Sequence, residues 1–376
     1  MTADRPARLG WLLSDLGVAG SCLPAVAASL AAGILLDSPR SGAVAAGAAV
    51  TVGFAAFKHV HRSRGFAMLA ATAGIALSTV AGTLAGRADV TMIAAVLLWG
   101  FAAGLLPAVD GALGWVGQQC AIFLMVAGNF PGGLEHAASR TELILAGSVA
   151  QILVVEGLRA LVRPPAAPGE VGASARAAVA TLAHEVRTRS DLFGRAVRVA
   201  VVLAAAVETW RWLHLPNGYW MAMTALLLVR PNLRATFGRA AQRVAGTVAG
   251  AGLATLLAHE LPRVTRYPSS HWVSAGLTAA FALLALVLQQ GNHLGRRLVD
   301  FAGSYLVFSA CLTAYVVYLL HYGGLDQREV AVARVLLTAF GGVFALAVHL
   351  PFERALRVPH LPHQAGAPAP QPRAGA

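Results

Sequence analysis

The chain has few charged residues: Asp, Glu, Lys and Arg together make up 12% of its 376 residues. A soluble domain carries about 25%, so this scarcity excludes an ordinary soluble globular protein. Hydrophobic residues account for 57% of the chain, and they gather in apolar runs of roughly 16 to 22 residues, close to the number that a helix needs to cross a bilayer. The sequence therefore predicts a membrane protein.

Cysteine is also scarce. Cys22, Cys120 and Cys311 each lie in an apolar run, where a thiol usually packs as a small side chain, and their spacing matches neither a disulfide framework nor a zinc site. The chain has no Walker A loop, and His184-Glu185 lacks the second histidine of the His-Glu-x-x-His motif. We therefore expect no enzyme activity, no cofactor and no metal.

The apolar runs predict an all-α, polytopic membrane protein with about twelve transmembrane helices. The runs are rich in Ala and Leu, without the alternation that marks the strands of an outer-membrane barrel. The expected spans lie near residues 18–36, 42–57, 66–86, 91–108, 112–129, 141–161, 196–214, 218–230, 244–259, 271–289, 301–321 and 331–350.

A proline-rich break at 163–170 divides the chain into two halves. Short matches relate them: Gly132-Gly133-Leu134-Glu135 precedes the sixth span, and Gly323-Gly324-Leu325-Asp326 precedes the twelfth. Six spans in each half predict two parallel repeats, and substrate sites in such proteins tend to lie between the repeats. The expected parts are an N-terminal six-helix half at 1–162, a cytoplasmic linker at 163–195, a C-terminal six-helix half at 196–352 and a disordered tail at 353–376.

The net charge of +12 follows from membrane topology. When the N-terminus is placed inside, most Lys and Arg residues fall in loops on the cytoplasmic side, as the positive-inside rule requires. This arrangement predicts a multi-pass protein of the inner membrane with both termini in the cytoplasm and with membrane lipids as partners. The basic residues are dispersed among the spans, so we expect no nucleic-acid partner.

Four arginines, Arg230, Arg234, Arg239 and Arg243, lie around the start of the ninth span. They form two pairs with a spacing of four, which places each pair on one face of a helix. A guanidinium group binds a carboxylate through two parallel hydrogen bonds, so the arginines predict an anion-binding mouth. For the first three, the alternative is the positive-inside rule together with binding of lipid phosphates.

Arg243 also begins a helix with small residues at regular spacing. Gly246, Thr247 and Gly250 follow it, and glycines four apart allow a neighbouring helix to approach closely. We expect these three residues to serve helix packing and Arg243 to bind substrate.

Tyr219 and Trp220 lie at the expected outer end of the eighth span. Aromatic rings often anchor a helix at the membrane interface. The alternative is that these two rings form a wall on which an aromatic substrate stacks, and Trp220 is our candidate for that role.

Ionisable residues inside spans are costly and are candidates for proton coupling. Glu208 is our first choice, because burial would raise its pKa; the alternative is an interfacial pair with Arg211. Glu156 has a similar alternative in a pair with Arg159. Asp300 and His349 complete the proton-coupling candidates, while Arg334 should seek a carboxylate or a substrate.

The second half resembles the fusaric acid resistance family, also called aromatic acid exporters. The resemblance rests on Gly218-Tyr219-Trp220, on Arg230-Pro231-Asn232 and on the run from Gln242 to Gly250, and Ala333-Arg334-Val335-Leu336 is similar to the family's last span. It covers roughly residues 195 to 352. The resemblance implies an inner-membrane exporter of aromatic carboxylates or related toxic amphiphiles, driven by the proton gradient.

Two other functions fit the same residues. One is an organic-anion channel, as in a related plant branch of the family, in which the arginines set selectivity. The other is a membrane scaffold or lipid-binding protein without a transported substrate. The sequence also leaves open a homo-oligomer and a periplasmic adaptor protein as partners.

Overall fold

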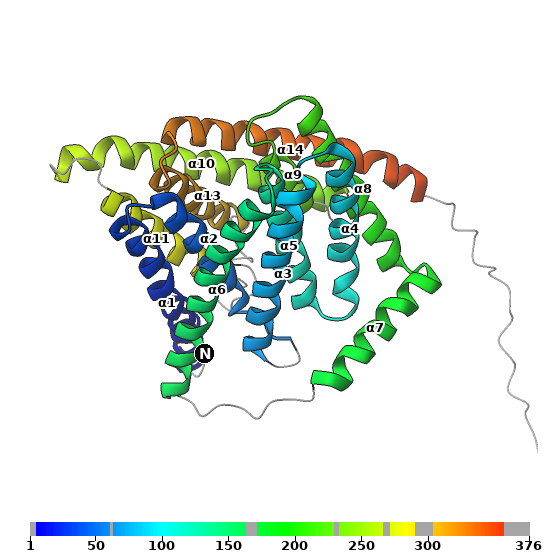
Figure 1. Cartoon of the computed structure of the whole chain (residues 1–376), viewed down its shortest axis with the longest axis horizontal. Coiled ribbons are helices and arrows are strands. Elements are labelled where there is room, and N and C mark those ends of the chain that lie inside the picture. Colours follow the sequence, from blue (N-terminus) through cyan, green and yellow to red (C-terminus); the bar gives the residue numbers. More distant parts are fainter. Residues whose placement is uncertain are drawn as a thin grey trace, which may run out of the picture.

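The computed structural model describes residues 5–60, 63–162, 171–228, 233–265, 271–289 and 304–356. Apart from an isolated bridge between Val60 and Ser63, the regular structure in these residues is helical (Figure 1), which confirms the all-α class. The elements are α1 (Arg5–Leu35), α2 (Pro39–Ala55), α3 (Arg64–Ala85), α4 (Asp89–Leu105), η1 (Leu106–Ala108), α5 (Gly111–Gly128), α6 (Leu134–Val162), α7 (Val171–Thr188), α8 (Asp191–Trp212), α9 (Tyr219–Leu228), α10 (Leu233–Thr265), α11 (His271–Leu288), α13 (Ser304–Tyr322) and α14 (Gln327–Leu356).

Eight segments of the described residues are long and apolar enough to cross a membrane. They lie in α1, α3, α4 with η1, α5, α6, α11, α13 and α14. The chain is therefore a multi-pass membrane protein. The expected count of twelve spans is not confirmed, because α2 has 17 residues and α9 has 10, and neither α8 nor α10 is among the eight.

Several helices begin at a residue whose side chain accepts a hydrogen bond from the first turn. Ser63 accepts from the backbone N–H of Phe66 at the start of α3, and Ser190 accepts from that of Phe193 at the start of α8, each at 3.2 Å. Asp110 caps α5 through the N–H of Ala112 at 2.6 Å. These caps mark where α3, α5 and α8 begin.

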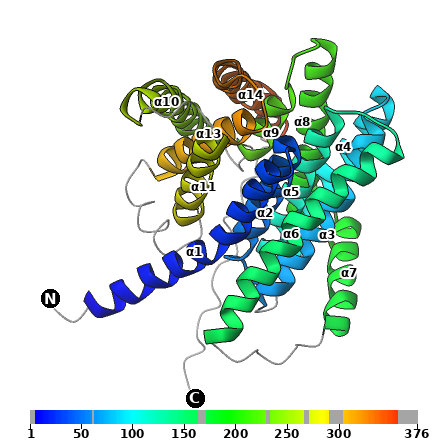
Figure 2. The same cartoon turned by 60° about the vertical axis from the view of Figure 1, so that its left-hand side comes forward.

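The helices do not stand in one parallel bundle. In Figure 1, α3, α4 and α5 run down the view, while α10 and α14 run across its top, and Figure 2 shows α10 and α14 nearly end-on. The amphipathic helix α7 lies to one side and contacts η1 and α8. Helices α10 and α14 are thus turned steeply relative to α3, α4 and α5.

Despite that turn, the two halves repeat the same helix pairings. In the first half, α3 packs against α5 and α6, and α2 packs against α6; in the second, α10 packs against α13 and α14, and α9 packs against α14. Between the halves, α4 packs against α8 and α11 packs against α1. Each of these pairings therefore has a counterpart.

Glycines make the same backbone contacts in both halves. A Cβ at Gly82 of α3, or at Gly86 just after it, would meet a carbonyl oxygen of α5 at 2.3 or 2.4 Å. A Cβ at Gly246 or Gly250 of α10 would meet a carbonyl oxygen of α13 at 2.4 or 2.2 Å. Such distances leave no room for a side chain, so only glycine allows these helices to touch. The carbonyls belong to Leu124, Gly128, Leu306 and Ala310, in that order.

A second matched contact joins the last helix of each half to its partner. A Cβ at Gly147 of α6 would lie 2.0 Å from the carbonyl oxygen of Ala45 in α2. A Cβ at Gly341 of α14 would lie 2.5 Å from that of Met221 in α9. Together the glycine contacts align α3 with α10, α5 with α13, α2 with α9 and α6 with α14.

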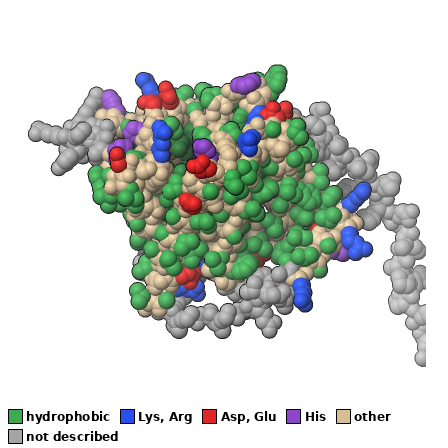
Figure 3. Space-filling view, in the orientation of Figure 1, with side chains coloured by type: hydrophobic (Ala, Val, Ile, Leu, Met, Phe, Trp, Pro, Cys, Tyr) green, Lys and Arg blue, Asp and Glu red, His purple; other side chains and the backbone are tan. Residues whose placement is uncertain are grey.

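The visible surface fits a protein that is covered by lipid around its middle. Hydrophobic side chains cover much of the centre of the face in Figure 3, and most charged side chains lie at its upper and lower edges. Beneath this surface, the largest apolar cluster includes Trp220, Met221 and Tyr318, so the core of the molecule reaches into the second half.

Candidate anion site

Two arginines are buried in the second half. Arg243 of α10 and Arg334 of α14 are each 1% exposed, and they rank among the largest fully buried side chains. The two guanidinium groups are close enough for each charge to act on the other. Because like charges repel and burial removes their hydration, this pair is costly unless an anion joins it.

Within the described residues, no carboxylate forms an ion pair with either arginine. The Nε of Arg243 and the Nε and Nη1 of Arg334 are buried and have no hydrogen-bond partner there. Buried charged groups are normally paired. The donors of this pair are therefore available to an anion.

The rings of α9 form one wall of the site. Trp220 is 2% exposed, and the Cζ atom of Arg334 lies 5.1 Å from the centre of its ring, within the range of a cation–π interaction. Tyr219 is also buried and meets Trp220 edge-on, with ring centres 5.4 Å apart. In this structure both rings lie inside the protein, as the stacking alternative requires, and not at its surface.

Helix α13 fixes the position of α10 and its arginines. Ser309 donates a hydrogen bond to the backbone oxygen of Arg243 at 3.2 Å, and Gly246 faces the α13 backbone one turn along. The Cζ atom of Arg239 lies 3.6 Å from the ring centre of Tyr305, close enough to stack on it. Arg239 thus packs against α13, and Arg243 lies one turn deeper.

Three threonines from the same helices are fully buried, and none of their hydroxyl groups has a hydrogen-bond partner among the described residues. They are Thr224 of α9, Thr247 of α10 and Thr338 of α14. Each lies one helical turn after a site residue: Thr224 after Trp220, Thr247 after Arg243 and Thr338 after Arg334. The region where α9, α10 and α14 meet thus combines two cations, aromatic rings and free hydroxyl groups, which suits an organic anion with an aromatic or apolar part.

The sequence of this region matches a known family. Residues 199–348 match the family described as "Fusaric acid resistance protein-like", and the matched segment contains Trp220, Arg243 and Arg334. The resemblance predicted from the glycine and arginine pattern is therefore confirmed for the second half.

Two curated relatives that the chain matches are described as uncharacterised proteins. The chain is 38% identical over 98 residues to the uncharacterised protein ORF2 of Neisseria gonorrhoeae, covering 26% of this chain and 23% of the relative. It is 25% identical over 179 residues to an uncharacterised protein of Haemophilus influenzae, covering 47% of this chain and 22% of the relative. The chain thus spans under a quarter of each relative's length. No solved structure matches it.

The predicted arginines that the structure describes differ in their exposure. Arg243 is buried, Arg239 is half-buried on Tyr305, and Arg234 is exposed, while Arg230 lies outside the described residues. Arg234 therefore fits the positive-inside alternative. The arginine that lies near Arg243 instead is Arg334, 91 residues later in this family segment.

The proton-coupling candidates lie away from the two arginines or outside the described residues. Glu208 is exposed on α8, so its expected burial is wrong. The alternative predicted for it was an interfacial pair with Arg211, but Arg211 forms its ion pair with Asp89. Glu156 pairs with Arg159 at 3.3 Å, which is the alternative predicted for it.

Asp300 and the side chain of His349 lie outside the described residues. Sequence reasoning missed Tyr305 and Thr338 altogether. Both look like ordinary residues of apolar runs, and only the packing of α13 and α14 onto α9 and α10 brings them to the site.

Proposed function

We propose that this chain transports small organic anions, chiefly aromatic carboxylates or related amphiphiles, out of the cytoplasm across the bacterial inner membrane. The observation that carries the proposal is the pair Arg243 and Arg334, both 1% exposed and without a carboxylate partner in the described residues. A bound carboxylate would offset the repulsion of the two charges and accept the free N–H groups. The neighbouring ring of Trp220 favours an aromatic substrate.

The test is uptake of labelled aromatic carboxylates by inverted membrane vesicles under an imposed pH gradient. We expect gradient-dependent uptake by the native chain and its loss in Arg243→Ala and Arg334→Ala. Arg234→Ala is the matched control, because Arg234 lies on the same helix as Arg243 but is exposed. Equal loss in the control would assign the effect to general charge and not to the site.

Proton coupling is part of the proposal, in which the inward proton gradient drives export of the anion. Glu156 is the described candidate that keeps a buried oxygen without a hydrogen-bond partner. Glu142, an exposed glutamate earlier on the same helix, provides the control. Glu156→Gln should abolish uptake against a concentration gradient while downhill exchange of anion continues, and Glu142→Gln should change neither.

An organic-anion channel is the second candidate. Arginine keeps its charge at physiological pH, so a pair of arginines without a described carboxylate also suits passive conduction. Currents through planar bilayers decide between the two. A steady anion current that disappears in Arg334→Ala would favour the channel, whereas electrically silent, proton-dependent flux would favour the exporter.

The proposed architecture is two six-helix repeats, at 1–162 and 196–352, joined by a cytoplasmic linker at 163–195. The repeated helix pairings and glycine contacts support it. The distribution of arginines supports a topology with both termini in the cytoplasm. The proposed partners are a second copy of the chain, as a homo-oligomer, and a periplasmic adaptor protein.

A further inference from the structure

Helix α7 (Val171–Thr188) differs in composition from the helices that cross the membrane. It separates its apolar and polar side chains more sharply than the other described helices do, and it is less apolar on average than the helices of the membrane spans. A helix of this kind, with arginines on its polar face, typically lies in the plane of the lipid–water boundary with its apolar face toward the acyl chains. The composition of α7 therefore predicts a helix at a membrane surface.

Part of the apolar face of α7 is uncovered. Val179 is 67% exposed and Val186 is 41% exposed, and their spacing of seven residues, about two turns, places them on one face. The half-buried residues Ala178, Leu182 and Glu185 mark the side of α7 that turns toward its neighbours, η1 and α8. These contacts leave the two valines open, and apolar surface that stays in water costs free energy.

Two arginines border this strip of valines. Arg176 and Arg187 are exposed and lie eleven residues apart, about three turns, so they share a face that is about 80° around the helix from the valines. Neither forms an ion pair with a carboxylate of the described residues, and Glu185 of α7 accepts a hydrogen bond from Ser190 at the start of α8. An arginine stem can lie along acyl chains while its guanidinium group binds a phosphate. The border of positive charge thus complements a surface of anionic lipid phosphates.

The neighbours of α7 hold it near the edge of the membrane. The span Asp89–Ala108 ends with η1, and α7 packs against η1. The span of α6 ends at Leu161, ten residues before Val171, and α8, which begins three residues after α7 ends, packs against α4. Figure 1 shows α7 outside the packed helices, and Lys and Arg side chains lie at the lower right of Figure 3, where α7 is seen. The surface that these attachments bring to α7 is therefore that of the lipid headgroups.

We propose that α7 lies in the headgroup layer of the membrane, with Val179 and Val186 among the first acyl carbons and with Arg176 and Arg187 on the phosphates of anionic phospholipids. In the proposed topology this layer belongs to the cytoplasmic leaflet. The linker between the two halves is then an anchor that fixes the start of α8 at the membrane surface. Anchoring of α7 is independent of the proposed anion site, which lies on other helices.

The experiment locates nitroxide labels on α7 by electron paramagnetic resonance, with the full chain in nanodiscs of phosphatidylethanolamine and phosphatidylglycerol. Single cysteines for labelling are introduced after Cys22, Cys120 and Cys311 are replaced by alanine. Dissolved oxygen concentrates among acyl chains and relaxes labels there, whereas a nickel chelate relaxes labels in water. The ratio of the two effects reports whether a side chain faces lipid or water.

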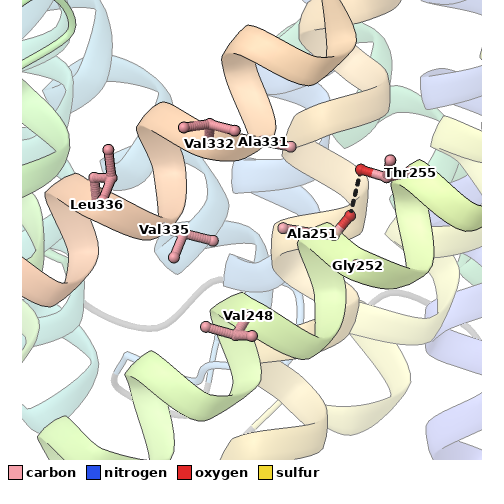
Figure 4. A pocket seen from close by; sticks show the side chains of 8 residues that line it. All are labelled: Val248, Ala251, Gly252, Thr255, Ala331, Val332, Val335 and Leu336. Atoms are coloured by element: carbon pink, nitrogen blue, oxygen red, sulfur yellow. Dashed lines mark hydrogen bonds between the residues drawn. The ribbon is translucent and has the colours of Figure 1, made fainter.

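Labels in Val179→Cys and Val186→Cys should be relaxed mainly by oxygen. Ala180→Cys is the matched control, because Ala180 is exposed on another face of the same helix, and its label should be relaxed mainly by the nickel chelate. Leu336→Cys is the lipid reference. Leu336 is 63% exposed within the α14 span and lines an apolar groove between α10 and α14 (Figure 4).

Charge removal tests the arginines. In Arg176→Gln/Arg187→Gln, or when phosphatidylcholine replaces phosphatidylglycerol, the oxygen-to-nickel ratio at Val179 should fall toward that at Ala180. Arg234→Gln/Arg328→Gln removes the same charge at exposed positions outside α7 and should leave the label at Val179 in lipid.

Three results would count against the proposal. Labels at Val179 and Val186 that the nickel chelate reaches as readily as the label at Ala180 would place the strip of valines in water. Labels that neither reagent reaches would place the strip against protein, such as a second copy of the chain. Lipid contact that persists in Arg176→Gln/Arg187→Gln and without phosphatidylglycerol would overturn the phosphate contacts.

Discussion

Arg334 is the residue at which stability and function should oppose each other. Its buried charge has no carboxylate partner in the described residues and lies close to a second charge, that of Arg243. Replacing buried charged groups by apolar side chains of similar size is often stabilising by about 1–4 kcal/mol. The same replacement removes donors that an anion would use.

We therefore predict that Arg334→Met raises the thermal midpoint in detergent and abolishes anion binding. A lost charge-assisted hydrogen bond of about 1.5–3 kcal/mol corresponds to roughly 10- to 100-fold weaker binding. Arg328→Met, at an exposed position of the same helix, should change neither quantity. A lower thermal midpoint in Arg334→Met would show that the charge has a stabilising partner.

His59 gives a prediction for pH. Burial, followed by the positive charges of Arg64 and Arg159, lowers the pKa of His59 below its usual value near 6.5. The unfolded chain therefore takes up a proton at higher pH than the folded chain does, so stability from this residue is complete above pH 6.5 and falls as the pH decreases through that value. Thermal midpoints between pH 7.5 and 5.5 should decline, and the decline should be smaller in His59→Gln.

At the scale of the helices, two glycines two residues apart on α10 should respond in opposite directions. A Cβ at Gly250 would lie 2.2 Å from the backbone oxygen of Ala310, whereas one at Gly252 would meet nothing within 4 Å. Gly250→Ala should destabilise the protein by about 1–3 kcal/mol, because α10 and α13 must move apart. Gly252→Ala should stabilise it by about 0.5–1 kcal/mol through helix propensity. Thermal unfolding of both variants tests the alignment of these helices.

Hydropathy located the helices but not their ends. The span expected at 244–259 is the apolar centre of α10, which runs from Leu233 to Thr265, because backbone hydrogen bonds extend a helix into charged sequence that hydropathy excludes. The same reason explains why α14 reaches Leu356. The membrane class, the helical class and the family resemblance could be predicted from the sequence, because each depends on local composition or on a contiguous motif.

The site could be predicted only in part. Arg243 was found through its position in a contiguous pattern, but its proximity to Arg334 depends on how α10 and α14 pack. For Trp220, which lies near the end of an apolar run, the sequence left open interface anchoring or substrate stacking. Its burial comes from contacts of α9 with α8 and α14. Sequence position alone does not show such tertiary contacts.

For the whole molecule, the matched glycines predict that the halves are not equivalent in binding. Aligning Gly82 with Gly246 places Thr79 where the second half has Arg243, and aligning Gly147 with Gly341 places Arg140 opposite Arg334. Thr79 donates its hydroxyl hydrogen bond to its own helix, and Arg140 donates to the backbone oxygen of Phe130. The first half therefore lacks the pair of cations.

We predict one anion bound per chain. Equilibrium dialysis with labelled benzoate should saturate at a single site, and Arg334→Ala should remove it without exposing a second one. Saturation at two equivalents would contradict the prediction, because the first half would then bind the anion through other residues.

The hydroxyl group of Tyr322 in α13 donates a hydrogen bond to the backbone oxygen of Leu30 in α1, 292 residues earlier. It lies beside Gly33 and Gly42, where α1 and α2 touch. At a synthesis rate of about 5–20 residues per second, the ribosome needs roughly 15 to 60 seconds to make the segment between them. During that interval α1 has entered the membrane without the tyrosine that will hold it. A chaperone or insertase that shields this seam until translation is nearly complete would therefore act on the newborn chain at its first two helices.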